Sequence, residues 1–418
     1  MSNITKIKGF ADLFSPDSDA MTFLEATARR VFGRYGYDEV RVPILEKTEL
    51  FARSIGEETD VVQKEMYTFP DRKDRSLTMR PEATAGILRA FIENKRHAEG
   101  QTSKLFTFGP MFRYERPQKG RMRQFHQIDA EIIGADEPHA DAELILMLWA
   151  FLGELGLAEL GLELNSLGCR ECRPHYHDAL RVFFQGIDRD ALCEDCRRRM
   201  DTNPLRVLDC KVPACKELTK DAPRITDTLC AGCQDHFATV KDVLDRCGLP
   251  YTLNPRLVRG LDYYIRTTFE VVSGNIGAQT AVAGGGRYDG LIKQLGGPDV
   301  PATGFACGME RLALLLPPRP AKTLDFYMAV IDAAGLETGM ALAQQLRAAG
   351  LEGEAAYNAR SLKSHMRAAN RLGARHCLLL GGSELAAGQI IAKHMESGEQ
   401  VALPLNDHNG LAAAIRAK

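Results

Sequence analysis

The sequence predicts an α+β protein built from more than one structural unit. Two strand-like segments enclose a polar loop between residues 105 and 134, which is the pattern of an antiparallel hairpin. Eight of the eleven cysteines lie between Cys169 and Cys233, in a stretch that interrupts the hydrophobic pattern. After a proline-rich linker at 317–320, strands and helices alternate, which is typical of a small α/β unit with a mostly parallel sheet.

The length and the net charge of the chain limit its possible functions. A chain of 418 residues is long enough for two or three cores, since single cores stop growing near ~250–300 residues. The formal net charge of −2 excludes a protein that coats a polyanion as a whole, so any RNA contact must come from local basic patches. Residues 1–10 lack a secretory signal, and no apolar run approaches the ~18–20 residues that span a bilayer. We therefore expect a cytoplasmic protein with no membrane partner.

The first predicted helix starts after Ser15, which offers an N-cap, with Pro16 at the first helical position. Apolar residues then recur at helical spacing, at Met21, Leu24, Ala28, Val31, Phe32 and Tyr35, until Gly36 ends the helix. The segment 39–44 alternates polar and apolar residues and reads as an edge strand, because it contains Pro43.

The following elements are assigned by composition and periodicity. In the first 320 residues we expect strands over Leu105–Arg113, Gln124–Ile133 and Val258–Val272, a helix over Ala140–Leu155, and a strand entering a helix over Gly304–Leu316. Beyond the linker we expect strands Phe326–Ile331 and His376–Leu380 and helices Gly335–Ala349, Ser361–Leu372 and Leu411–Arg416.

Three arginines lie at positions that suit the binding of an anion. Arg113 ends a predicted strand, Arg259 precedes a glycine, and Arg311 lies in a predicted helix. A guanidinium is always charged and its rigid fork of donors suits phosphate oxygens. The glycines at 284–286 would let the backbone approach a ligand closely. Taken singly, the same residues also fit solvated arginines and a mobile loop.

The clustered cysteines indicate a metal before they indicate disulfides, because C-x-x-C pairs are typical of zinc knuckles. Two pairs close one tetrahedral site, so the sequence predicts one or two structural Zn²⁺ held by Cys169, Cys172, Cys193, Cys196, Cys210, Cys215, Cys230 and Cys233. Eight reduced structural cysteines are the alternative interpretation.

Long strings of the sequence carry a family resemblance. Phe112–Gln127 resembles motif 2 of the class II aminoacyl-tRNA synthetases, Gly304–Leu312 resembles motif 3, and Glu39–Glu46 fits the looser motif 1. Leu257–Tyr264 and Ala283–Asp289 resemble the two motifs peculiar to the histidyl-tRNA synthetases, and with Met79–Ala85 the resemblance covers essentially the whole chain.

The resemblance implies a class II catalytic domain over residues 1–320, with an antiparallel sheet flanked by helices. It further implies a cysteine-rich subdomain inserted at 166–250 and a C-terminal α/β anticodon-binding domain at 321–418. The implied activity is ATP-dependent conversion of L-histidine to histidyl-adenylate and its transfer to tRNA(His), with release of AMP and diphosphate. The family also implies a homodimer.

Residue roles follow from the same resemblance. Arg259, the main catalytic residue, would bridge the α-phosphate and the substrate carboxylate, and Arg113 would hold the α-phosphate. ATP, bound with Mg²⁺ on its β- and γ-phosphates, would contact Arg113, Glu115, Phe125 and Arg311. The ammonium of histidine would meet Glu82, Ala83, Thr84 and Gln127, and its imidazole Glu131, Tyr263, Tyr264 and Tyr288. Without the resemblance, Glu82 and Glu131 would fit surface salt bridges, and the tyrosines would fit the wall of a core. Ala83 stands where the family usually has glycine.

Two basic segments are candidate tRNA-binding surfaces. The loop residues Arg116, Gln118, Lys119, Arg121 and Arg123 would face the acceptor end. Lys363 and Arg367 belong to a basic stripe at helical spacing, with Arg360 and Arg371, that would bind the anticodon stem. A merely solvated charged surface is the alternative for both.

A second function class competes with the enzyme. A regulatory paralogue of the histidyl-tRNA synthetases partners ATP phosphoribosyltransferase, the first enzyme of histidine biosynthesis, without aminoacylating tRNA. Such proteins typically lack the anticodon-binding domain and erode the motifs. Here Arg113, Arg259 and Arg311 are present and a separate C-terminal domain is expected, so the sequence favours the enzyme.

Overall fold

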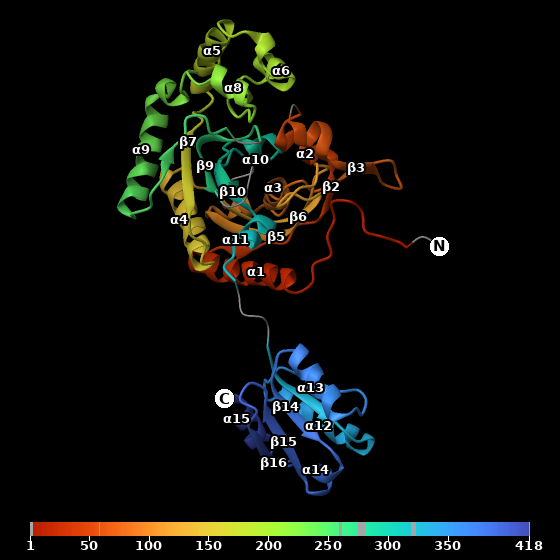
Figure 1. Cartoon of the computed structure of the whole chain (residues 1–418). Helices are drawn as coiled ribbons and strands as arrows, with labels where there is room; N and C mark the ends of the chain where they lie inside the picture. The colour runs from red at the N-terminus through yellow and green to blue at the C-terminus, as the bar shows by residue number, and fades with distance from the viewer. Residues whose placement is uncertain (1–2, 58, 259–260, 275–280, 319–322, 418) are drawn as a thin grey trace. The chain divides into compact units, whose positions relative to one another are not determined.

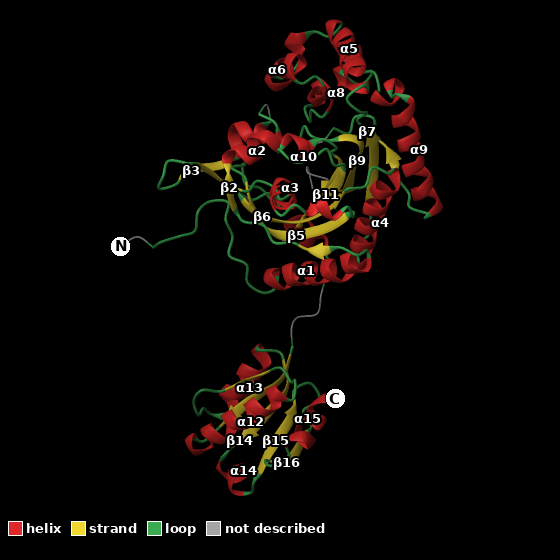
Figure 2. Cartoon of the chain, turned by 180° about the vertical axis from the view of Figure 1, so that it is seen from behind, coloured by secondary structure: helices red, strands yellow, loops and turns green. Residues whose placement is uncertain are grey.

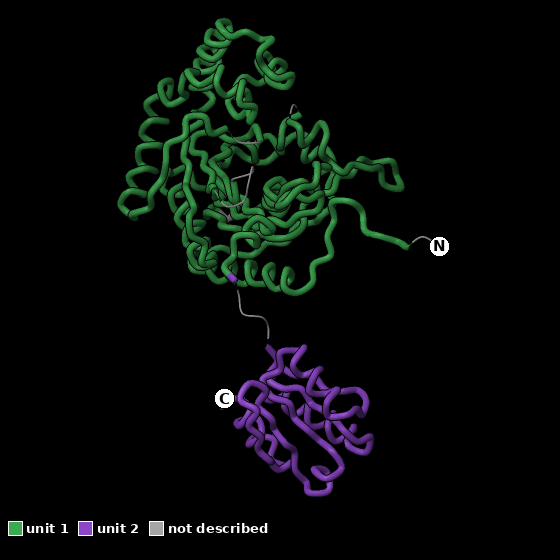
Figure 3. The backbone as a smooth tube through the Cα atoms, viewed as in Figure 1, with its two compact units in different colours: residues 1–317 green, residues 318–418 purple. Residues whose placement is uncertain are grey.

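The structure, a computed structural model, describes residues 3–57, 59–258, 261–274, 281–318 and 323–417. The chain divides into two compact units, residues 1–317 and 318–418, and each is described by itself (Figure 3). Among the described residues, no helix is both long enough and apolar enough to cross a membrane.

In the described residues, unit 1 is built on an eight-stranded sheet with the order β1-β5-β6-β11-β10-β9-β7-β8 (Figure 1). Its strands are β1 Asp38–Glu39, β5 Ser103–Phe112, β6 Gln124–Ile133, β7 Leu160–Ser166, β8 Thr252–Leu253, β9 Ile265–Ser273, β10 Ala281–Arg287 and β11 Ala302–Gly308. All neighbours pair antiparallel except at the two ends of the sheet, where β1 and β8 are parallel to their partners. The predicted antiparallel sheet is therefore confirmed.

Helices cover this sheet, and unit 1 also contains a small, separate sheet. One layer contains α1 Asp17–Arg34, α4 Pro138–Glu154, α9 Ala231–Arg246 and α11 Met309–Leu315. Figure 2 shows α1 running below the strands, and α4 and α9 lying side by side. Elsewhere in the unit lie α2 Thr48–Ile55, α3 Thr84–Glu93, α10 Leu291–Gln294 and a sheet of β2 Leu45–Lys47, β3 Tyr67–Pro70 and β4 Ser76–Met79.

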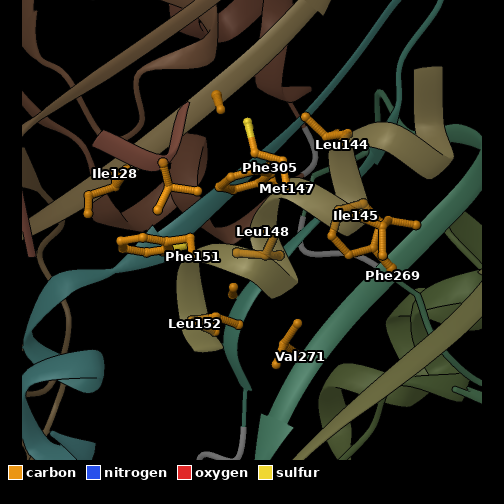
Figure 4. Close-up of a cluster of buried hydrophobic side chains, with 14 of the residues drawn as sticks. Ile128, Leu144, Ile145, Met147, Leu148, Phe151, Leu152, Phe269, Val271 and Phe305 are labelled. Carbon is orange, nitrogen blue, oxygen red and sulfur yellow. The ribbon is translucent and has the colours of Figure 1, made fainter. Parts of the chain in front are cut away.

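Apolar residues on alternate positions of the strands pack against the helical layer (Figure 4). Phe151 of α4 and Phe305 of β11 both lie beside Phe32 of α1, with ring centroids 5.4 and 5.9 Å from it. Burying each such side chain contributes roughly 1.5–3 kcal/mol. On β6, Ile128, Ala130 and Ile132 point into this core, so Asp129 and Glu131, which alternate with them, point to the opposite face of the sheet.

Between β7 and β8 the chain leaves the sheet and forms a cysteine-rich insertion. Its helices are α5 Cys172–Gln185, α6 Glu194–Thr202, α7 Leu205–Leu208 and α8 Pro213–Leu218, and α9 returns the chain to the sheet. Figure 1 shows α5, α6 and α8 gathered at one end of unit 1.

Unit 2 is a small α/β sandwich. In its described residues the strand order is β13-β12-β14-β15-β16, and the strands are β12 Leu324–Val330, β13 Gly353–Ala355, β14 Ala374–Leu380, β15 Gln389–His394 and β16 Gln400–Pro404. The helices are α12 Leu336–Ala348, α13 Leu362–Arg371, α14 Gly382–Ala386 and α15 His408–Arg416. Only the pairs of β12 with β13 and β14 are parallel, so the predicted mostly parallel sheet is wrong for β15 and β16.

Three local predictions need correction. Pro16, not Ser15, occupies the cap position of α1, and the Ser15 hydroxyl donates to Asp19 over 2.6 Å instead. The strand expected over 39–44 covers only Asp38–Glu39, because the chain turns away after one further hydrogen bond at Val40 and Pro43 has no N–H to donate. The strand expected from Val258 begins at Ile265.

Candidate functional site

A cavity of about 410 Å³ lies in unit 1, on the face of the sheet opposite the helical layer. Strand β6 contributes Phe125, Gln127 and Asp129, which alternate with the core residues of the same strand. Strands β10 and β11, helix α11 and the loop between β5 and β6 supply further walls. The alternation of β6 thus places polar groups in the cavity while it buries apolar ones behind it.

One part of the cavity gathers guanidinium groups. Arg113, Arg121 and Arg311 all line it, and the positive charges of Arg121 and Arg113, added to burial, lower the pKa of Arg311. Arg311 is held in place by donating to the carbonyl oxygens of Gly120 over 3.2 Å and Ala281 over 2.6 Å. Such a cluster of close, partly buried cations is a natural anion site.

The predicted partners of a nucleotide base lie beside these arginines. Phe125 and Glu115 both line the cavity. The guanidinium of Arg113 lies 5.5 Å from the centre of the Phe125 ring, and its Nε donates to the carbonyl oxygen of Pro81 over 2.8 Å. Glu115 forms an ion pair with Arg121. Arg259 lies outside the described residues.

Another part of the cavity is rich in acceptors. Glu82 is buried, and its Oε1 accepts from the backbone N–H of Ala85 over 3.0 Å, which caps α3. Burial raises the pKa of Glu82, although hydrogen bonds from the backbone N–H groups of Ala85 and Thr84 oppose the change. Its Oε2 and the side-chain oxygen of Gln127 have no hydrogen-bond partner among the described residues. Buried acceptors without donors are costly and suit a cationic ligand.

Behind this part lies a buried hydrogen-bond network. Thr84 donates to Oε1 of Glu131 over 2.7 Å, and the hydroxyl of Tyr288 donates to Oε2. Burial raises the pKa of Glu131 well above its usual range, and the two hydrogen bonds offset only part of this. A Cβ atom at position 304 would lie 1.6 Å from Glu131 Oε2, so this position of β11 requires glycine.

The predicted imidazole pocket is only partly exposed to the cavity. Tyr263 and Tyr264 line it, with ring centroids 4.6 Å apart, and Tyr288 lies 5.5 Å from Tyr263 on the buried side. Burial raises the pKa of Tyr263 well above its usual range. Glu131 and Ala83 are also buried and are not among the described residues that line the cavity.

The glycine patch has a different role from the one predicted for it. Only Gly284 of its three glycines borders the cavity. A Cβ atom at Gly285 would lie 2.1 Å from the carbonyl oxygen of Gly304, so this glycine allows β10 and β11 to pack closely.

Sequence reasoning missed one whole wall of the cavity. The insertion contributes cationic residues from α6 and the segment after it, namely Arg198, Arg199, Arg206 and Lys211. Arg199 donates to Asp60 over 2.9 Å, which joins the insertion to the segment after α2. The run Arg197–Arg199 was the only signal in the sequence, and a charged run alone does not reveal what it faces. Asp129 was also missed.

The eight cysteines of the insertion form two tetrads. Tetrad 1 contains Cys169, Cys172, Cys230 and Cys233, and tetrad 2 contains Cys193, Cys196, Cys210 and Cys215. Within each tetrad the sulfur atoms lie within 4.8 Å of one another. Backbone N–H groups donate to these sulfurs, as from Cys230 to Cys172 over 3.1 Å. The sequence proposed the pairs, and the fold shows which pairs meet.

The candidate tRNA-binding residues differ in exposure. In the β5–β6 loop, Arg116, Gln118 and Lys119 are exposed, whereas Arg121 and Arg123 are half-buried. Arg123 stacks 3.7 Å from the centre of the Tyr114 ring. In unit 2, the basic stripe formed by α13 and by Arg360, two residues before it, is exposed throughout, at Arg360, Lys363, Arg367 and Arg371.

Comparisons with known proteins agree over the whole chain. The family profile of histidyl-tRNA synthetase matches residues 9–312, and that of an anticodon binding domain matches residues 326–411. The histidine–tRNA ligase of Oleidesulfovibrio alaskensis is 65% identical over 99% of this chain and 100% of the relative. The solved apo histidyl-tRNA synthetase of S. aureus is 36% identical, with a TM-score of 0.82 over 99% of this chain and 100% of that one. A regulatory subunit of ATP phosphoribosyltransferase/histidyl-tRNA synthetase from Bacillus halodurans, 18% identical with a TM-score of 0.67 over 90% of this chain and 98% of that one, shares the fold alone.

Glu131→Gln should raise the free energy of unfolding relative to that of the unchanged chain, and this difference should grow as the pH rises. Because burial raises the pKa of Glu131 above the unfolded value of ~4.3, the folded state binds this proton more tightly. The free energy of unfolding therefore falls as the pH rises through the window above the unfolded pKa, and glutamine removes that loss. Urea unfolding at a series of pH values between about 4 and 8 measures the difference.

Glu154→Gln is the matched control and should show the opposite sign. Although desolvation opposes it, hydrogen bonds and charges from Arg34 and Arg30 lower the pKa of Glu154. The stabilisation of the folded state by ionised Glu154 is therefore present above the unfolded pKa and is lost as the pH falls. Equal pH slopes for the two variants would contradict the assignment of Glu131 as a buried, unfavourably placed carboxylate.

Proposed function

The chain belongs to the histidyl-tRNA synthetase family, and from that premise we propose that Arg113 and Arg311 hold the phosphates of ATP beside a pocket for histidine. The enzyme is a class II aminoacyl-tRNA synthetase that uses ATP to activate histidine and ligates it to tRNA. The observation that carries the proposal is one cavity in which a cluster of guanidinium groups adjoins buried acceptors that have no donor among the described residues.

Activation brings a carboxylate to the α-phosphate of ATP, and these two anions repel each other. The reaction therefore needs fixed positive charge more than it needs an acid or a base. The charge of Arg113 acts both on Arg311 and on Glu82, so this guanidinium lies between the cationic and the acidic parts of the cavity. We assign Arg113 to the α-phosphate and Arg311 to the γ-phosphate, with Phe125 and Glu115 at the adenine. Arg259 keeps the role that the family resemblance gives it, and Mg²⁺ would accompany the β- and γ-phosphates.

Histidine would be recognised at both ends. Glu82 and Gln127 would offer its ammonium acceptors that are unpaired in the described part of the chain, next to Thr84. Tyr263 and Tyr264 would wall the imidazole, with Glu131 and Tyr288 behind them. Buried polar partners discriminate strongly, because a substrate without the ring nitrogens leaves them unpaired. We further propose a cytoplasmic homodimer that is specific for tRNA(His).

A regulatory paralogue is disfavoured. Histidine–tRNA ligases at 52–66% identity match 95–99% of the chain, and unit 2 matches an anticodon binding domain. The regulatory subunit from Bacillus halodurans shares the fold at 18% identity, which does not support the regulatory function for this chain.

Arg113→Ala and Arg311→Ala should each lower the rate of histidine-dependent exchange of pyrophosphate into ATP by about 10²–10³-fold, because Arg113 supplies a preorganised positive charge to the transferred α-phosphate and Arg311 supplies one to the departing pyrophosphate. Arg72→Ala, in the exposed turn between β3 and β4, is the matched control and should leave the rate unchanged. Exchange by the unchanged enzyme with another amino acid, or with none, would overturn the assignment of the substrate.

Lys363→Glu with Arg367→Glu should weaken the binding of full-length tRNA and lower its salt slope by about one unit for each lost phosphate contact. The acceptor-arm minihelix serves as the control ligand. It should bind as before, since α13 would face the anticodon stem and the exposed β5–β6 loop residues Arg116, Gln118 and Lys119 would face the acceptor end. Unchanged binding of full-length tRNA would refute the role of this stripe.

Each cysteine tetrad is proposed to hold one structural Zn²⁺. A tetrahedral site with Zn–S bonds of ~2.3 Å separates its sulfur atoms by ~3.8 Å. The sulfurs of Cys169 and Cys172 are 3.6 Å apart, those of Cys169 and Cys230 are 3.9 Å apart, and those of Cys193 and Cys210 are 3.9 Å apart. The donor set therefore fits the ion in both tetrads.

Elemental analysis should find two zinc ions per purified chain. Replacing Cys193 and Cys196 by serine should remove one ion and also slow pyrophosphate exchange, because α6 forms part of the cavity wall. Replacing Cys169 and Cys172 should remove the other ion. The exposed Cys247 lies outside both tetrads, so Cys247→Ser should retain both ions. Less than one zinc per chain would refute the proposal.

A further inference from the structure

The cavity contains a carboxylate to which the proposed function gives no role. Asp129 lies on the same face of β6 as Gln127 and Glu131 and lines the cavity, yet it is only 1% exposed. Neither of its carboxylate oxygens has a hydrogen-bond partner within the described parts of the chain. A buried carboxylate left unpaired in this way is unfavourable by several kcal/mol in general, so a missing partner is the simplest account of it.

The charged groups around Asp129 do not supply that partner. Burial and the negative charge of Glu82 raise its pKa well above the usual range, and the charges of Arg80 and Arg113 offset only part of this. Arg80 donates instead to the carbonyl oxygens of Pro110 over 2.9 Å and Val42 over 3.1 Å. The Nε of Arg113 donates to the carbonyl oxygen of Pro81. The nearest guanidinium groups are thus anchored to the backbone.

This part of the cavity contains three side chains with oxygens that no described residue pairs, namely Glu82, Gln127 and Asp129. The hydroxyl hydrogen of Thr84 is already given to Glu131. A ligand that satisfies three acceptors, two of them carboxylates that repel each other, must carry several N–H donors and a positive charge. A primary ammonium has three donors and one charge. A hydroxyl or an amide would leave the negative charge uncompensated.

We propose that Asp129 is a further substrate-binding residue, which accepts a hydrogen bond from the α-ammonium of histidine beside Glu82 and Gln127. This inference rests on the proposed function, which places the ammonium at Glu82 and Gln127. Two carboxylates then compensate one ammonium, and the repulsion between Glu82 and Asp129 in the empty site is relieved when the substrate enters. Asp129 would therefore raise the affinity for amino acids over analogues that lack the amino group.

The test is Asp129→Asn, which keeps the shape of the side chain but replaces one acceptor with a donor and removes the charge. Two ligands separate the ends of the substrate. Histamine has the ammonium and the imidazole, and 3-(imidazol-4-yl)propionate has the imidazole without the ammonium. Dissociation constants come from calorimetry, and inhibition constants from competition in pyrophosphate exchange.

Asp129→Asn should weaken histamine and histidine about 10- to 100-fold, the range expected for a hydrogen bond to a charged group, and leave imidazolylpropionate bound as tightly as before or more tightly. The thermal midpoint of the unliganded variant should stay the same or rise, since an unpaired buried carboxylate is removed. Asp299→Asn, which alters an exposed carboxylate, is the matched control and should change none of these values.

Equal weakening of both ligands, or none, would overturn the proposal. A variant that unfolds would also overturn it, because Asp129 would then stabilise the protein itself. Failure of the proposed function is recognised separately: the unchanged enzyme would then show no histidine-dependent pyrophosphate exchange. If the unchanged enzyme activates histidine while Asp129→Asn binds histamine normally, only the role of Asp129 fails.

Discussion

Strand β6 separates the apolar core from the polar cavity, and the alternation of its side chains supplies residues to both. Its even-numbered residues Ile128, Ala130 and Ile132 pack into the helical layer, while Phe125, Gln127, Asp129 and Glu131 stand on the opposite face. A shift of register by one residue would push the carboxylates into the apolar core and turn the apolar residues toward the cavity. The pairing of β6 with β5 and β11 therefore fixes the chemistry of the site as firmly as it fixes the fold. The absence of a side chain at Gly304, opposite Glu131, is part of the same constraint.

The cavity holds like charges together at a cost to the empty protein. Arg121 and Arg113 make the charge on Arg311 less favourable, and Glu82 does the same to Asp129. Arg311 and Asp129 would each be more stable in water or beside an opposite charge. In the proposed function, a triphosphate at the arginines and an ammonium at the carboxylates would make the arrangement favourable. Because the charges are fixed by hydrogen bonds to the backbone, as at Arg113 and Arg311, the proposed reaction would need little reorganisation of these groups.

Long elements with a clear period could be predicted from the sequence, and short or edge elements could not. The periodicities of α1, α4 and the β5–β6 hairpin placed these elements to within a few residues. Strands β15 and β16 were missed because they form the antiparallel end of the sheet of unit 2, where only one face is buried and the apolar pattern is weak. The glycine patch was recognised, but whether a glycine serves a ligand or a neighbouring strand depends on tertiary packing. At Gly285 it is the strand.

Some residues of the site could likewise be predicted from the sequence, and others could not. Motif strings pointed to Arg113, Arg311 and Glu82, which the fold brings to one cavity, but they carried no signal for the wall formed by the insertion. Spacing could identify cysteine pairs but could not say which pairs meet, because four pairs combine into tetrads in more than one way. The observed combination has a consequence for the cavity. Tetrad 2 brackets α6 and the segment up to Cys215, so the Zn²⁺ proposed for it would hold in place the stretch that carries Arg198, Arg199 and Lys211. Apolar side chains of the insertion, among them Met200, Leu205 and Val207, already pack this stretch from within. The proposed Zn²⁺ would add a closed site that further restrains the charged residues, because metal binding to such ligands stabilises the folded segment.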